Sequence, residues 1–156
     1  MRSTASNQVT RTNGATRMVR ACLWLLVIAA GLALRKFGPE LGLSFALVKY
    51  GGSLLWGTMV FFAVAMAASG QSRWNIGLIA ISIAVCVELF RLVHTPWLDD
   101  FRLTTSGALL LGRVFSPWNM LAYGAGIVVG MGLDRLGTAA FAKAILSPPD
   151  APHSAN

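Results

Sequence analysis

Residues 74–93 read WNIGLIAISIAVCVELFRLV, and this stretch decides the fold class. A helix over these residues would be apolar on every side, apart from Glu88 and Arg91 near its end. About 20 mostly apolar residues match the hydrocarbon thickness of a bilayer, whereas a helix of a soluble protein has one polar face. We therefore interpret the stretch as a transmembrane helix that begins at an interfacial tryptophan, Trp74.

Three runs of the same kind surround this stretch, at residues 18–34, 48–69 and 118–133. A further apolar segment, residues 103–115, is too short to cross a bilayer, and we expect it to form a short interfacial helix. The sequence therefore predicts an all-α fold. It is a multi-pass transmembrane helical bundle of about four spans, with a short interfacial helix between the third and fourth.

The composition agrees with a protein whose main solvent is lipid. Hydrophobic residues make up 55% of the chain and charged residues only 12%, against about 25% charged residues in an ordinary soluble domain. Lys and Arg number 13 against 6 Asp and Glu, a net charge of +7. These basic residues are spread around the spans, which is typical of membrane-helix flanks. We therefore expect membrane lipids as partners and no nucleic acid.

Both ends of the chain are predicted to be tails. Residues 1–17 are polar and basic and should be disordered, and residues 135–156 form a C-terminal tail that should be disordered from about residue 147. The first run could instead be the core of a cleaved signal peptide. We favour an uncleaved helix, because the run is longer than a usual signal core and ends at Arg35 and Lys36.

The orientation follows from the basic residues around the spans. With a cytoplasmic N-terminus, seven basic residues lie inside and six outside: Arg2, Arg11, Arg17, Arg20, Arg73, Arg135 and Lys143, against Arg35, Lys36, Lys49, Arg91, Arg102 and Arg113. The totals nearly balance, but the first helix usually dominates, and its upstream arginines favour a cytoplasmic N-terminus. We expect a multi-pass protein of the cell inner membrane.

A candidate polar site lies at the non-cytoplasmic face, because the segments after the first and third spans share that side. It consists of Arg35, Lys36, Lys49, Trp56, Glu88, Arg91, His94, Trp97, Asp99 and Arg102. Charges inside spans are costly, so each needs a partner or a purpose. Glu88 and Arg91 are three residues apart on one helix face, where they can form a structural pair or hold a functional acid.

This net basic site suits an anionic or amphipathic ligand, such as a lipid headgroup or a lipid-linked cell-envelope intermediate. In this hypothesis the anionic group of the ligand is held by Lys49, Arg91 and Arg102. The apolar part of the ligand is flanked by Trp56 and Trp97. The three cations are oriented by Glu88, Asp99 and His94. An enzymatic alternative uses Glu88, His94 and Asp99 as acid-base groups, which requires them to converge within about 3 Å.

A third alternative is a non-catalytic assembly partner, because Gly126 and Gly130 in the last span have the GxxxG spacing that lets helices approach closely. Packing within one chain is favoured over a homo-oligomer through that span. The chain shows no serine-nucleophile signature, and catalytic residues remain unknown. Cys22 and Cys86 lie in apolar runs without metal-binding spacing, so we expect no metal and no cofactor.

The polar residues also carry a family resemblance over about residues 31–133. The residues concerned are Arg35-Lys36-Phe37, Lys49-Tyr50, Trp56, Glu88, His94-x-Pro96-Trp97-Leu98-Asp99, Arg102-x-Thr104-Thr105-x-Gly107, Gly112 and Tyr123-x-x-Gly126. The chain resembles the bacterial integral membrane family known as domain of unknown function 2809, and more distantly the VanZ-like family. The resemblance implies a bacterial multi-pass membrane protein, and it supplies no substrate. Ser53 replaces an acidic residue of the family pattern, and Arg91 replaces a glutamine.

Overall fold

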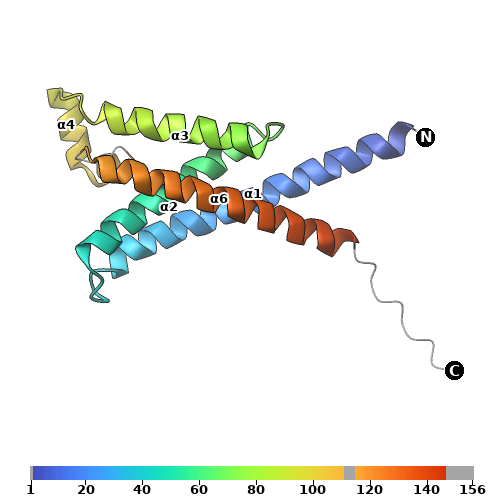
Figure 1. Cartoon of the computed structure of the whole chain (residues 1–156), viewed down its shortest axis with the longest axis horizontal. Coiled ribbons are helices and arrows are strands. Elements are labelled where there is room, and N and C mark those ends of the chain that lie inside the picture. Colours follow the sequence, from blue (N-terminus) through green and yellow to red (C-terminus); the bar gives the residue numbers. More distant parts are fainter. Residues whose placement is uncertain (1, 111–114, 147–156) are drawn as a thin grey trace.

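The computed structural model describes residues 2–110 and 115–146, and within them all regular structure is helical (Figure 1). The helices are α1 (Arg2–Phe37), α2 (Phe45–Ala67), α3 (Arg73–Phe90), α4 (Pro96–Leu103), α5 (Thr105–Leu110) and α6 (Pro117–Leu146). Segments long and apolar enough to cross a membrane are Thr16–Phe37, Phe45–Ala67, Arg73–Phe90 and Pro117–Lys143. The predicted all-α transmembrane bundle is therefore confirmed.

Local sequence sets where the second and third spans begin. The hydroxyl groups of Ser44 and Ser72 accept hydrogen bonds from the backbone N–H groups of Leu47 (3.3 Å) and Asn75 (3.2 Å). Such caps satisfy N–H groups that have no partner inside the helix. Gly42, in the turn between α1 and α2, has a φ of +73°, which glycine adopts without strain. Short turns therefore fold α1, α2 and α3 back on one another.

The helices α2 and α6 form the centre of the bundle, and α1 and α3 each pack against both of them. Both central helices run from the end where α4 lies to the end where the chain termini lie (Figure 1). We call these the α4 end and the terminal end. The core between the helices includes Phe61, Phe62, Ala65, Ile76 and Ala80, which are completely buried.

The glycines of the last span allow α6 to lie directly against α2. A Cβ atom on Gly126 would lie 2.0 Å from the carbonyl oxygen of Leu54, and one on Gly130 would lie 2.8 Å from the ring of Phe61. The hydroxyl group of Thr58 donates a hydrogen bond to the carbonyl oxygen of Gly126 at 2.7 Å. The GxxxG face is therefore used for packing within one chain, and it is covered by α2.

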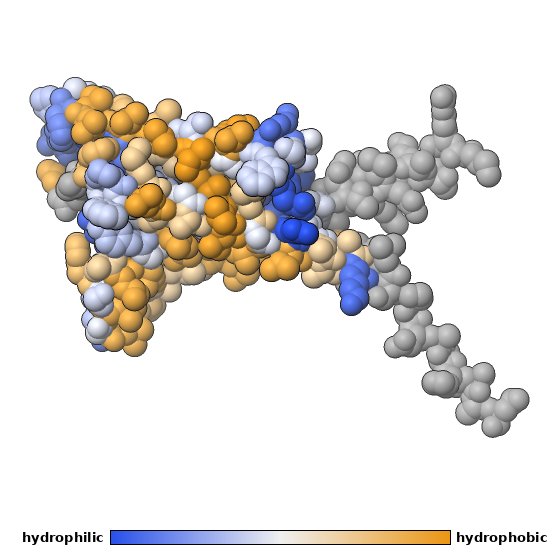
Figure 2. Space-filling model, in the orientation of Figure 1, coloured by the Kyte–Doolittle hydropathy of each residue, from blue (hydrophilic) through white to orange (hydrophobic). Residues whose placement is uncertain are grey.

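The surface of the bundle carries an apolar belt with hydrophilic residues at both ends (Figure 2). Large apolar side chains point outward on several helices, for example Leu25 on α1, Leu78 on α3 and Val128 on α6, which are 59%, 63% and 68% exposed. Such exposure would be costly in water, but it is expected where side chains face lipid.

The first and last helices are longer than the sequence-based prediction. The helix α1 starts at Arg2, so the segment 1–17 is helical from its second residue rather than disordered. Once a helix has nucleated, adding residues costs little, and no proline precedes Pro39. The helix α6 likewise continues to Leu146, well past the expected end of the last span. The tail from residue 147 lies outside the described residues.

The short segment between the third and fourth spans also differs from the prediction. The structure has α5 from Thr105, within the predicted range 103–115, and it adds a further helix, α4, from Pro96. Proline is favoured in the first turn of a helix because its missing N–H group would have no partner there. Residues 111–114 lie outside the described residues.

Candidate functional site

Glu88 is completely buried near the end of α3, and its carboxylate accepts four hydrogen bonds. The oxygen Oε2 accepts from Nη1 of Arg91 at 2.5 Å and from the hydroxyl group of Tyr123 at 3.1 Å. The oxygen Oε1 accepts from the backbone N–H of Ser116 at 2.7 Å and from Nδ2 of Asn119 at 3.4 Å. A buried charge is tolerated when it is paired and fully hydrogen-bonded, as Glu88 is.

The Glu88 cluster, which we define as Glu88, Arg91, Ser116, Asn119 and Tyr123, also reaches α2. Oδ1 of Asn119 accepts a hydrogen bond from the hydroxyl group of Ser53 at 3.3 Å. The rings of Trp56 and Tyr123 are packed with their centroids 4.8 Å apart. The cluster therefore joins α2, α3 and the start of α6. Glu88 also places its negative charge at the N-terminus of α6, where the helix dipole favours an anion.

Arg102 on α4 binds the backbone at the C-terminal end of α3. Its guanidinium group donates hydrogen bonds to the carbonyl oxygens of Phe90 (2.7 Å) and Val93 (2.8 Å) and to Oδ1 of Asp99 (3.0 Å). Arg102 is only 3% exposed. Nδ1 of His94 lies 3.2 Å from the same Asp99 oxygen. These contacts satisfy carbonyl groups that a helix end leaves without partners.

The remaining candidate residues stay at the surface. Arg35, Lys36 and Lys49 are exposed, and none of them makes an ion pair within the described ranges. The ammonium group of Lys49 lies 5.2 Å from the centre of the Tyr50 ring. Trp97 on α4 is 69% exposed. The structure thus divides the predicted site into the buried Glu88 cluster, the α4 contacts and these exposed groups.

An apolar groove lies at the α4 end between α1, α2 and α6. Its volume is about 510 Å³, and it is lined by Leu34, Ser44, Ala46, Leu47, Tyr50, Gly51, Leu54 and Ala122. A second hollow of about 420 Å³ lies beside it, lined by Ala33, Leu34, Phe37, Gly38, Glu40, Leu41 and Leu43. We call the first one the α1–α6 groove. Figure 1 shows that α1 and α6 cross and then diverge toward the α4 end.

The comparison with protein families identifies most of the site region. The family model described as "Protein of unknown function (DUF2809)" matches residues 43–127, more than half of the chain. The chain belongs to the DUF2809 family. The match spans the Glu88 cluster and α4, and it gives no support to the more distant VanZ-like likeness. No solved structure matches the chain.

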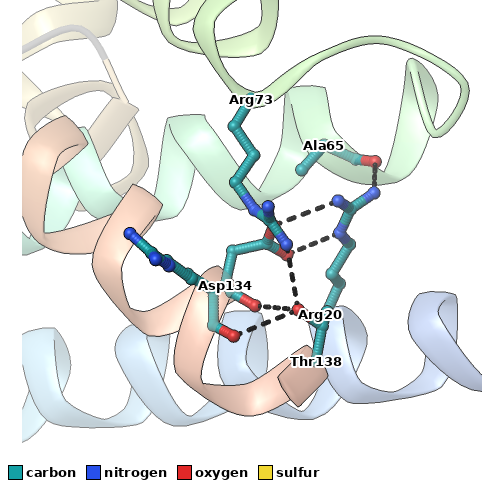
Figure 3. A network of polar contacts seen from close by, with 6 residues as sticks. Arg20, Ala65, Arg73, Asp134 and Thr138 are labelled. Carbon is teal, nitrogen blue, oxygen red and sulfur yellow. Dashed lines mark hydrogen bonds and ion pairs between the residues drawn. The ribbon is translucent and has the colours of Figure 1, made fainter. Parts of the chain in front are cut away.

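This DUF2809 protein has a second buried carboxylate, at the terminal end (Figure 3). Asp134 on α6 is completely buried, and Nε of Arg20 on α1 lies 2.7 Å from Oδ1. Nε of Arg73 on α3 lies 2.9 Å from Oδ2. Arg20 also donates to the carbonyl oxygen of Ala65 on α2 at 2.8 Å, and Arg73 donates to the hydroxyl group of Thr138 at 3.0 Å. We call Arg20, Arg73 and Asp134 the triad.

The triad was not predicted from the sequence, although one signal was present. Arg20 lies inside the first apolar run, and a charge within a span should have a partner. Its partner could not be identified, because Asp134 lies 114 residues away. Arg20 and Asp134 also lie outside the segment 43–127 that the family model matches. No group of three or more His, Cys, Asp or Glu suited to a metal occurs in residues 2–110 and 115–146.

Proposed function

We propose that this protein binds an anionic, amphipathic ligand in the α1–α6 groove. The ligand class is a membrane lipid or a lipid-linked cell-envelope intermediate. The observation that carries the proposal is the groove itself, an apolar hollow whose lining residues Leu34 and Tyr50 are the sequence neighbours of the exposed cations Arg35 and Lys49. The hollow has a volume of about 510 Å³ and is wide open on one side, so a ligand in it would also contact the surrounding lipid.

The chemistry of the groove suits a molecule with an apolar chain and a charged head. Leu34, Leu47 and Leu54 provide apolar contact, and Ser44 and Tyr50 are the polar side chains of the lining. Each buried methylene group of a ligand contributes about 0.8 kcal/mol. The ammonium group of Lys49 lies beside Tyr50, so it can pair with an anionic head while the chain occupies the groove.

The structure changes which cations we assign to the ligand. Arg91 is paired with Glu88, and Arg102 binds two carbonyl oxygens and Asp99, so both are engaged within the protein. Lys49, Lys36 and Arg35 therefore replace them as the proposed contacts. In this proposal Glu88 and Asp99 organise the framework at the α4 end and do not touch the ligand.

The proposed location is the inner membrane of a bacterium, with the N-terminus in the cytoplasm. The arginines at the start of α1 support this orientation, because basic residues before the first span favour the cytoplasmic side. The α1–α6 groove would then open at the non-cytoplasmic face.

The enzymatic alternative receives less support from the geometry. His94 and Asp99 are in contact at 3.2 Å, but the four donors to Glu88 do not include His94, and Glu88 is completely buried. The side chain of His94 is 67% exposed. The assembly alternative also receives less support, because it requires a partner helix on the face of Gly126 and Gly130, and α2 covers that face.

Native mass spectrometry with lipid identification tests the proposal on protein extracted gently from membranes. We expect the wild type to retain an anionic lipid or lipid-linked molecule, and Lys49→Ala to lose it because the head group has no cation. Ala46→Trp should also lose it by filling the groove. Ala63→Trp is the matched control, since Ala63 is exposed on the same helix but does not line the groove. Equal retention by all four proteins, or none by the wild type, would refute the proposal.

A further inference from the structure

The triad at the terminal end is not neutral. Arg20 and Arg73 carry two positive charges, and Asp134 carries one negative charge between them. No other acidic side chain makes an ion pair with either arginine in residues 2–110 and 115–146. By contrast, the Glu88 cluster contains one acid and one base. The terminal end therefore holds an excess positive charge close to the membrane-spanning segments, where an unpaired charge is costly.

The excess charge reaches the surface through Arg73. The side chain of Arg20 is 7% exposed and is bound to Asp134 and to the carbonyl oxygen of Ala65. The side chain of Arg73 is 43% exposed. Nε and Nη2 of Arg73 are bound to Asp134 and Thr138, and its Nη1 makes no hydrogen bond within the described part of the chain. Two side chains of α6 thus hold the guanidinium group (Figure 3), and the partly exposed side chain can still donate to an external acceptor.

The position of Arg73 along the bilayer normal identifies that acceptor. Arg73 is the first residue of a candidate span, and Trp74 beside it is 76% exposed. Tryptophan side chains at the ends of spans lie at the level of the lipid head groups. Arginine binds phosphate oxygens through two parallel N–H groups, and its planar group makes such contacts specific. A phosphate group of the surrounding lipid is therefore the anion placed within reach.

We infer that Arg73, held by Asp134 and Thr138, binds the phosphodiester head group of an anionic lipid in the leaflet at the terminal end. The Arg20–Asp134 pair lies behind this contact and fixes Arg73 against α6. This lipid site is distinct from the α1–α6 groove, which lies at the α4 end and is lined by other residues. Its occupant is a structural lipid that neutralises the triad and supports the contact between α1, α3 and α6.

Lipid counting by native mass spectrometry tests the inference, with protein released from bilayers that contain phosphatidylglycerol and phosphatidylcholine. We expect Arg73→Gln to lower phosphatidylglycerol retention by about tenfold, since the variant loses a direct hydrogen bond between a guanidinium group and a phosphate oxygen. The variant should fold, because Arg20 still neutralises Asp134. Lys49→Ala should keep this lipid, so failure of the groove proposal and failure of this one are distinguishable.

Arg135→Gln is the matched control for surface charge. Arg135 is exposed and adjacent to Asp134 in sequence, but the triad contacts do not include it. We expect the replacement of Arg135 to change phosphatidylglycerol retention by less than about twofold. In the proposal Arg73 touches the lipid phosphate directly, whereas Arg135 acts on it only through screened long-range attraction. Equal losses in the two variants would show general attraction to a basic surface and would overturn the inference.

Discussion

Two buried carboxylates hold opposite ends of this bundle, and they are satisfied in different ways. Glu88 pairs with one arginine, Arg91, which directly follows the same helix, and neutral donors complete its hydrogen bonding. Asp134 pairs with two arginines, Arg20 and Arg73, from two other helices. The α4 end is therefore fastened by a local, charge-balanced pair, and the terminal end by long-range contacts with an excess positive charge.

The difference shows how each end depends on the rest of the fold. The partners of Glu88 are placed mainly by α3 and by the start of α6, so its main charge pair exists wherever α3 is helical. The partners of Asp134 meet only when α1, α3 and α6 are assembled together. Removing one partner of a buried ion pair leaves an uncompensated charge, whereas replacing both partners by apolar residues can be nearly neutral. Substitutions at the two carboxylates can therefore separate the stability that comes from contacts near one helix end from the stability that requires three helices to pack together.

The largest effect is expected for Glu88→Leu. Arg91 is 7% exposed and would lose its carboxylate, so the free energy of unfolding should fall by about 3–5 kcal/mol. The measurement is denaturant unfolding of the purified protein in detergent micelles. Glu88→Leu combined with Arg91→Leu should recover most of the loss. A double variant as unstable as the single one would mean that the neutral hydrogen bonds, and not the ion pair, dominate this end.

At the terminal end, Arg20→Leu should lower the unfolding free energy by about 1.5–3 kcal/mol, the cost of losing buried hydrogen bonds to a charged group. Arg73→Leu should cost about 1 kcal/mol or less, because a partly exposed ion pair contributes little. The difference follows from side-chain exposures of 7% and 43%. The same unfolding titration measures both, and equal losses would show that the two arginines share Asp134 equally.

An effect no larger than that of Arg20→Leu is expected for Tyr123→Phe, which removes one of the donors to Glu88 but keeps the ring that packs on Trp56. Arg91 still pairs with the same oxygen, so we expect a loss of about 1.5 kcal/mol in unfolding free energy. Tyr123→Leu is the control that removes the ring as well and should cost more. No change in the phenylalanine variant would mean that the hydroxyl group contributes nothing to the Glu88 cluster.

The smallest effect is expected for Thr138→Val. The hydroxyl group of Thr138 accepts a hydrogen bond from Arg73 at the partly exposed side of the triad, and its loss should cost about 0.5–1 kcal/mol. Thr138→Ser keeps the hydroxyl group and should behave like the wild type in thermal unfolding. If the valine variant also loses phosphatidylglycerol, the orientation of Arg73 is required for lipid binding.

The sequence predicted those parts of the fold that depend on local spacing. Long apolar runs marked the spans, because a bilayer requires that length, and the Glu88–Arg91 pair was visible because helical residues three apart are neighbours. The helix ends were less accurate, since α6 continues well beyond the last apolar residues. Hydropathy marks where lipid contact ends, whereas a helix ends where its backbone hydrogen bonds do.

By itself, the sequence determined that this chain is a helical membrane bundle of the DUF2809 family, because hydrophobic length and local helix geometry are written along the chain. Only the tertiary structure decided that Arg20 and Arg73 meet Asp134, that α2 covers the glycines of α6, and that α1 and α6 separate into a groove. The physical reason is that such contacts depend on how helices cross one another. Residues 114 positions apart carry no local signal of that arrangement.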